Sequence, residues 1–258
     1  MYIYSNSQRF DRLEFQNPGL RILPTVTSKA KKTTHHIDMN RKIQDIAPLL
    51  ADDFVDFEID LLTIENYRKL LDQEKHRIGL YYKYIPLLHD SGVIETKIME
   101  NKFSLTLNEF TRFVFASALI DKKGLNIDKE KMTFPLQIDF DIINLTFNKV
   151  DDSGLIQPIE PTDLGVYLYE QIVSIDNDKL EIGMIFWKDY ENKPGEHILI
   201  LLTARNINII EKQDEKWIHY FGESFNKYLD FYKLQLESGE YFSDQWICEK
   251  MIDKLDKE

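Results

Sequence analysis

The dipeptide His89-Asp90 is the strongest candidate for chemistry in this sequence of 258 residues. An imidazole and a carboxylate are both ligands of divalent transition metals, so the pair could belong to a metal-assisted hydrolase. Such a site needs further ligands, and the other histidines show no matching arrangement. The alternative interpretation is structural, because an aspartate ahead of Ser91-Gly92 can accept backbone N–H groups and shape a turn into a strand. We expect no bound metal or cofactor.

Carboxylates on expected strands are a second candidate. Glu170 and Glu181 could meet across the hairpin expected over 166–187. Asp139 and Asp141 lie on another expected strand. Paired carboxylates divide acid and base roles when their surroundings separate their pKa values, but charges that alternate along a half-buried strand usually form its solvent-exposed face. We therefore assign no catalytic residue. The candidate binding residues are His89, Asp90, Tyr169, Glu170 and Glu181.

Other catalytic signatures are missing from the sequence. There is no glycine-rich phosphate loop, no G-x-S-x-G and no H-E-x-x-H. The single cysteine, Cys248, excludes a disulfide framework, and the neighbouring Glu249 disfavours the thiolate that a nucleophile needs. The cluster at 35–38 (HHID) lies close to three lysines, whose charge disfavours a bound cation, so we interpret it as a solvent-exposed loop.

Strand patterns dominate the middle of the chain. Residues 103–107 alternate between apolar and polar side chains, as on a half-buried strand, and the same period continues over 136–142. The phase shifts by one residue near Asn144, which predicts a bulge or a break. The run 112–120 fits either a buried strand or a short helix. Further strands are expected over 166–175, 180–186 and 197–209.

Helical patterns flank these strands. Apolar residues recur at helical spacing within 41–88 and again within 222–255, and Pro48 limits the first helix. Strands grouped between helices, without a repeating βαβ order, indicate an α+β fold. We expect a mainly antiparallel sheet over about 93–210, flanked by N- and C-terminal helices.

The charge of the chain is unevenly placed. Residues 1–50 carry eight basic and four acidic residues, and residues 51–258 carry 24 basic and 40 acidic ones, a net charge of −16. An acidic body repels nucleic acid and attracts basic proteins. We expect residues 1–40 to form an irregular basic arm and residues 41–258 to form one domain.

A membrane-spanning helix is not expected from this sequence. The longest apolar run, residues 198–202, is far shorter than the span of about 20 residues that crosses a bilayer as a helix. The first residues lack the apolar core of a targeting segment. We therefore expect a cytoplasmic protein that does not bind membranes.

Several short motifs resemble a family of uncharacterised bacterial proteins. They are the His89-Asp90 turn followed by Val93-Ile94, FSLTLN (103–108), INLTF (143–147), VYLYEQIV (166–173), KLEIGMIF (179–186) and ARNINII (204–210). In that family a helical N-terminal part precedes a sheet that carries an HD turn, and a related pattern is similar to some immunity proteins of polymorphic bacterial toxin systems. The resemblance covers about residues 60–210, and Gln171 stands where the family has a second glutamate. It implies a shared fold.

Charge, missing catalytic signatures and the resemblance together predict a binding protein. We expect an immunity-like module that masks a protein partner with a basic surface, and we do not expect an enzyme. The acidic body would speed the encounter with such a partner. The alternative is a metal-assisted hydrolase with a site around His89 and Asp90.

Overall fold

Antiparallel strands make up most of the chain that the computed structural model describes. This part comprises residues 41–51, 54, 65–67, 69–74, 78, 81, 88–176, 178–190, 193–212 and 250. Of these residues, 55% lie in strands and 24% are helical. The prediction of an α+β fold in which N- and C-terminal helices flank the sheet is therefore wrong.

The described elements are few and include several long strands. The helical elements are α1 (Ile43–Ile46), the 3₁₀ turn η1 (Pro48–Leu50), α3 (Phe110–Lys123) and the 3₁₀ turn η3 (Lys129–Lys131). The strands are β1 (Ser91–Met99), β2 (Lys102–Asn108), β3 (Pro135–Val150), β4 (Ile156–Ile159), β5 (Val166–Asp176), β6 (Lys179–Tyr190) and β7 (Lys193–Glu211).

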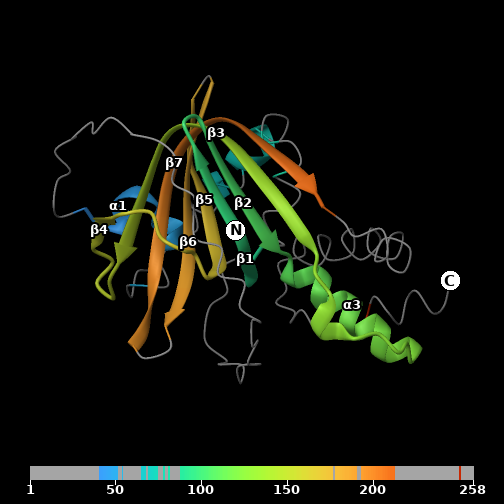
Figure 1. Cartoon of the computed structure of the whole chain (residues 1–258). Helices are drawn as coiled ribbons and strands as arrows, with labels where there is room; N and C mark the ends of the chain where they lie inside the picture. Colours follow the sequence, from blue (N-terminus) through green and yellow to red (C-terminus); the bar gives the residue numbers. More distant parts are fainter. Residues whose placement is uncertain are drawn as a thin grey trace.

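The sheet closes on itself. Its strand order is β2-β1-β5-β6-β7-β3-β4, and β2 also pairs with β3, so six strands form a ring and β4 extends it beside β3. The weakest link of the ring is between β1 and β5, which pair only at Ser91 and Gly92. Figure 1 shows the strands curving side by side, with α3 leaving the sheet at its lower right end.

A bulge bends the long strand β3. Its pairing with β7 is irregular between Phe140 and Asn144, where Ile142 pairs with Ala204. Leu136, Ile138 and Phe140 are fully buried before this point, and Phe147 is buried after it. Because an extra residue reverses the alternation and bends the strand, the predicted irregularity near Asn144 is confirmed.

The ring encloses the main hydrophobic core. Phe103, Leu105 and Leu107 of β2 have no exposed surface, as their alternation predicts. Helical residues from before β1 lie in the same core, and the Tyr81 ring packs against Phe140 of β3 with ring centroids 6.2 Å apart. The α-helical members of this core that precede β1 are Tyr67, Leu71, Ile78 and Tyr81, and α3 adds Phe115, Ala116, Leu119 and Ile120.

A second core covers the outer face of the ring. Ile185 of β6 and Leu199 of β7 point outward and pack with Ile43 and Leu50. The backbone approaches closely here, since a Cβ on Gly183 would lie 3.1 Å from the Leu50 Cδ1 atom. Because both faces of β6 and β7 are buried, these strands read as continuous apolar runs instead of alternating ones.

The helical expectations differ from the structure for local reasons. Proline cannot donate its backbone nitrogen to a helix, and α1 ends after four residues, just before Pro48 begins the turn η1. The run 112–120 is helical, within α3, which ends at Gly124 in the left-handed conformation with φ of 60°. None of the described helices is long and apolar enough to cross a membrane. The arm expected over 1–40 and the helices expected over 222–255, apart from the helical Lys250, lie outside the described residues.

Candidate functional site

A bulge in β5 decides which side chains of the candidate site point into the ring. Tyr167 pairs with Phe186 and Tyr169 with Ile185, so Leu168 is the extra residue. Glu170 then pairs with Met184, whose side chain lies in the main core. Because directly opposite residues of an antiparallel pair share a face, Glu170 points into the interior, where only 5% of it is exposed.

Tyrosines surround the Glu170 carboxyl group. The Tyr167 hydroxyl donates a hydrogen bond to Glu170 Oε2. Tyr67 and Tyr81 are buried close enough for the charge of Glu170 to raise their pKa values, in addition to the larger effect of burial. The Tyr67 hydroxyl also accepts the Ile172 N–H at 3.1 Å, which anchors the helical residues to β5.

Burial keeps a proton on Glu170 near neutral pH. Loss of solvation disfavours the carboxylate and raises the pKa of Glu170 to about 7, although the hydrogen bond from Tyr167 and the charge of His89 act in the opposite direction. The same burial, together with the negative charge of Glu170, raises the pKa of Tyr167 well above its ordinary value. The cluster therefore contains one group, Glu170, whose protonation changes near pH 7.

His89 and Asp90 form the turn before β1. Their side chains are partly exposed, and His89 Nδ1 lies 2.9 Å from Asp90 Oδ2. Asp90 has φ of 61°, the left-handed conformation that aspartate tolerates in turns. The His89 ring packs on Tyr169, with ring centroids 4.7 Å apart. The predicted turn is confirmed, and the carboxylate of Asp90 faces the imidazole of His89.

The structure brings three of the five candidate binding residues into contact, whereas the fourth, Glu170, lies on the inner face of β5, opposite to Tyr169. His89, Asp90 and Tyr169 are in contact, and the charge of His89 reaches Glu170. Within the described residues, no group of three or more histidine, cysteine, aspartate or glutamate side chains could hold a metal ion. The hydrolase alternative therefore has no further ligand from this part of the chain.

The fifth residue, Glu181, lies elsewhere. It pairs with Thr203 and Ser174, between the inward residues Leu180 and Ile182, and so points to the outer face of the ring. Its carboxylate accepts the Ser174 hydroxyl at 2.9 Å. Glu170 and Glu181 are on opposite faces of the sheet and do not form the carboxylate pair that was considered.

Asp139 and Asp141 also point away from the interior. The buried residues Ile138 and Phe140 alternate with them along β3. Lys102 Nζ lies 2.7 Å from Asp139 Oδ2. Burial opposes ionisation of Asp139, but hydrogen bonds, the largest from Lys102, outweigh it and lower the pKa of this carboxyl group. Asp139 is therefore a structural anion that joins β2 to β3.

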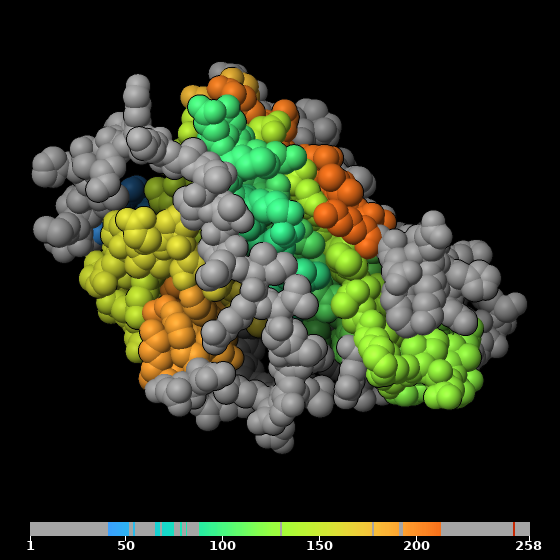
Figure 2. All heavy atoms as spheres, in the orientation of Figure 1, coloured from blue at the N-terminus to red at the C-terminus, as the bar shows by residue number. Residues whose placement is uncertain are grey.

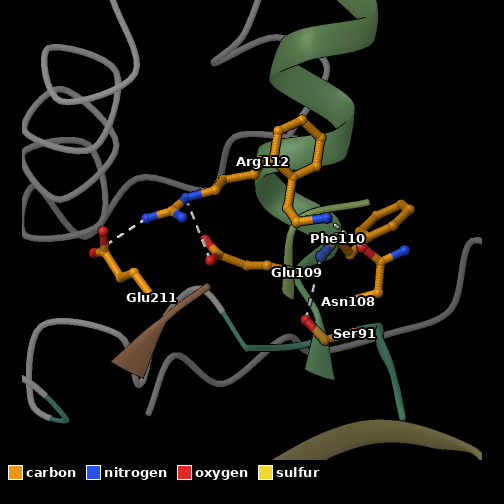
Figure 3. Close-up of polar contacts among 7 residues, drawn as sticks. Ser91, Asn108, Glu109, Phe110, Arg112 and Glu211 are labelled. Atoms are coloured by element: carbon orange, nitrogen blue, oxygen red, sulfur yellow. Dashed lines mark hydrogen bonds and ion pairs between the residues drawn. The ribbon is translucent and has the colours of Figure 1, made fainter. Parts of the chain in front are cut away.

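A buried ion cluster at the start of α3 was missed by the sequence analysis. Arg112 has 4% of its side chain exposed and lies between two carboxylates (Figure 3). Its Nε is 3.4 Å from Oε2 of Glu109, which is fully buried, and its Nη2 is 3.3 Å from Oε1 of Glu211 at the end of β7. Ser91 Oγ accepts the Phe110 N–H in the same region. The cluster ties α3 to β7 and β1, and the i,i+3 spacing of Glu109 and Arg112 is the signal that could have revealed it.

The chain between β3 and β5, which includes β4, is acidic over residues 151–163. We call these residues the acidic connection. It contains four carboxylates and no basic residue. Asp151 accepts hydrogen bonds from the Ser153 side chain and from the N–H groups of Ser153 and Leu155, which hold its pKa below the ordinary value. The other three carboxylates are exposed and belong to Asp152, Glu160 and Asp163.

An aromatic cluster lies beside the acidic connection. Trp187 contacts His197 with ring centroids 4.6 Å apart, and its Nε1 donates to Asp189 at 2.7 Å. Burial lowers the pKa of His197, and the charge of Asp152 acts against this shift, which places Asp152 close to the cluster. In Figure 2 the yellow atoms of the acidic connection and β5 adjoin the orange atoms of the β6–β7 hairpin at the left of the view.

Comparisons with protein families, with curated proteins and with solved structures gave no match for this chain. The resemblance to immunity proteins stays a prediction, and the function must be inferred from the residues of the chain itself.

Proposed function

We propose that this protein is a binding module, immunity-like in action, that masks a protein partner with a basic surface. The acidic connection and the adjacent Trp187 would form the contact surface. The single observation that supports this most is the exposure of three carboxylates in a connection that contains no basic residue.

The acidic connection has the properties of an interface rim. Exposed charges at a rim mainly set the association rate and its dependence on salt, because they act at a distance and remain solvated. The fixed turn at Asp151, with three hydrogen bonds to its carboxylate, limits the conformational freedom that binding would have to remove. The net charge of −16 on residues 51–258 adds a long-range field of the same sign.

Trp187 supplies an aromatic anchor beside this rim. Its ring lies across the hairpin, since a Cβ on Gly195 would come within 2.2 Å of a carbon of the indole ring. The contacts with His197 and Asp189 fix the ring in a half-buried position. Tryptophan residues held in this way often provide the largest contributions to protein–protein binding.

A comparison of two neutralised variants tests the proposal. The triple variant D152N/E160Q/D163N removes three exposed carboxylates from the acidic connection. The control variant D176N/D178N/E181Q removes the same charge from the other end of β5. Both changes leave the same net charge, so only the position of the lost charge differs.

We expect wild type and the control variant to capture the same basic protein from native lysate, and the triple variant to lose it. With the captured partner, association at low salt should be about tenfold slower for the triple variant than for the control, and the difference should shrink as salt rises. Equal capture and equal rates for both variants would refute the acidic connection as the contact surface.

A further inference from the structure

Among the described residues, no strand pairs with the outer edge of β1 beyond its first residues. Ser91 and Gly92 pair with β5, and the Val93 N–H donates to the Gly165 carbonyl at 2.9 Å. From residue 94 to residue 99, the pairing of β1 within the described chain is to β2 alone. The green surface of β1 and β2 reaches the front of the molecule in Figure 2. An open strand edge presents backbone donors and acceptors that another strand can use.

Residues 94–98 of this edge alternate apolar ends with a charged pair around a central threonine. Ile94 is 50% exposed and Ile98 is 40% exposed, although both are large and apolar. Between them, Glu95 and Lys97 form an ion pair with Nζ and Oε2 2.7 Å apart, and Thr96 is the middle residue. The segment reads apolar, negative, polar, positive, apolar, so its charges become complementary when it is reversed.

We propose that a second copy of this chain pairs with the β1 edge, strand against strand and antiparallel, around a two-fold axis at Thr96. In this register Thr96 lies opposite its own copy and Glu95 lies opposite Lys97, within the part of β1 that pairs regularly with β2. Directly opposite residues of an antiparallel pair point to the same face. Both charged side chains of the segment therefore meet a partner of opposite charge, as a two-fold symmetric interface requires.

The same features argue for a second copy over an unrelated strand. A bulge at Ile94, between Val93 and Glu95, and the charge of Lys97 are devices that discourage indiscriminate pairing of an edge. In the symmetric pair the charges meet as two Glu95–Lys97 ion pairs between the copies. Burying these charges is therefore unfavourable only when the edge pairs with a strand that lacks the opposite charges. This interface is separate from the acidic connection and does not depend on the proposed function.

Charge reversal on the full chain tests the dimer. K97E places two negative residues opposite each other across the axis, and E95K places two positive ones, so each should weaken dimerisation by at least about tenfold in sedimentation equilibrium. The double variant E95K/K97E restores two opposite-charge pairs and should dimerise like wild type. An equimolar mixture of the two single variants should form a heterodimer for the same reason. Both side chains are partly exposed, with 32% and 58% of their surface accessible, so thermal unfolding at a concentration where every variant is monomeric should be nearly unchanged.

Two results would overturn the inference. One is a wild-type chain that stays monomeric at the highest concentration measured, which would leave the edge to a strand of another protein or to none. The other is a dimer whose dissociation constant does not respond to the single reversals, or a double variant that fails to recover it, which would place the interface elsewhere.

Discussion

Replacing Arg112 with methionine should lower the free energy of unfolding by about 3–5 kcal/mol, because it leaves the buried carboxylate of Glu109 without the guanidinium that faces it. Burial lowers the pKa of Arg112 and the charge of Glu109 opposes this, so each group compensates part of the cost of burying the other. Methionine fills a similar volume, which separates the loss of charge from the loss of packing. Urea unfolding at neutral pH measures the difference.

Two controls show whether the effect comes from the Glu109–Arg112 pair. E211Q removes the charge of the carboxylate that is 39% exposed, and should cost less than about 1 kcal/mol. The double variant E109Q/R112M should be more stable than R112M alone, since it no longer buries a lone charge. A loss below about 1 kcal/mol for R112M, or a double variant weaker than the single one, would contradict the importance of this buried pair.

Local patterns allowed parts of the sheet to be predicted. The alternation at 103–107 reports one buried face directly, and the structure buries Phe103, Leu105 and Leu107 as expected. The phase change near Asn144 likewise corresponds to the irregular pairing of β3. The turn at His89-Asp90 followed from the side-chain chemistry of aspartate beside serine and glycine. In each case the determining interactions lie within a few residues of one another.

The interior of the ring could not be predicted in the same way. Its closure depends on pairing between β1 and β5 and between β2 and β3, and no local pattern encodes which strands meet. The burial of both faces of β6 and β7 removes the alternation that would reveal their inward side. The helical residues around Tyr67 fill the ring instead of flanking the sheet, which is the main reason the predicted fold class was wrong.

The orientation of Glu170 shows most clearly what the sequence pattern cannot predict. The strand 166–173 contains Tyr169 and Glu170 side by side, and a single extra residue, Leu168, decides which of them points inward. Shifting a strand by one residue reverses every side chain. The sequence analysis therefore named Glu170, but it did not predict the buried state of the carboxyl group or Tyr167 as its hydrogen-bond partner.

The free energy of unfolding of the wild type should fall as the pH rises from about 5 to 8, and replacing Glu170 with glutamine should abolish this fall. The folded chain holds the Glu170 proton up to a pKa of about 7, whereas the ordinary pKa of a glutamate, expected in the unfolded chain, is 4.5. Between these values the unfolded chain releases a proton that the folded chain retains, so wild-type stability falls as pH rises. At about 1.4 kcal/mol for each unit of pKa difference, the loss comes to roughly 3 kcal/mol.

The variant E170Q keeps an oxygen that can accept the Tyr167 hydroxyl but carries no charge at any pH. We therefore expect its free energy of unfolding, relative to wild type, to improve by roughly 3 kcal/mol on going from pH 5 to pH 8. E181Q provides the matched control, because it makes the same change at an exposed glutamate of the outer face. Urea unfolding of the three proteins at several pH values gives the comparison. If E170Q and E181Q follow wild type in parallel across this range, Glu170 is ionised in the folded protein near pH 5, and the tyrosine cluster does not hold its proton.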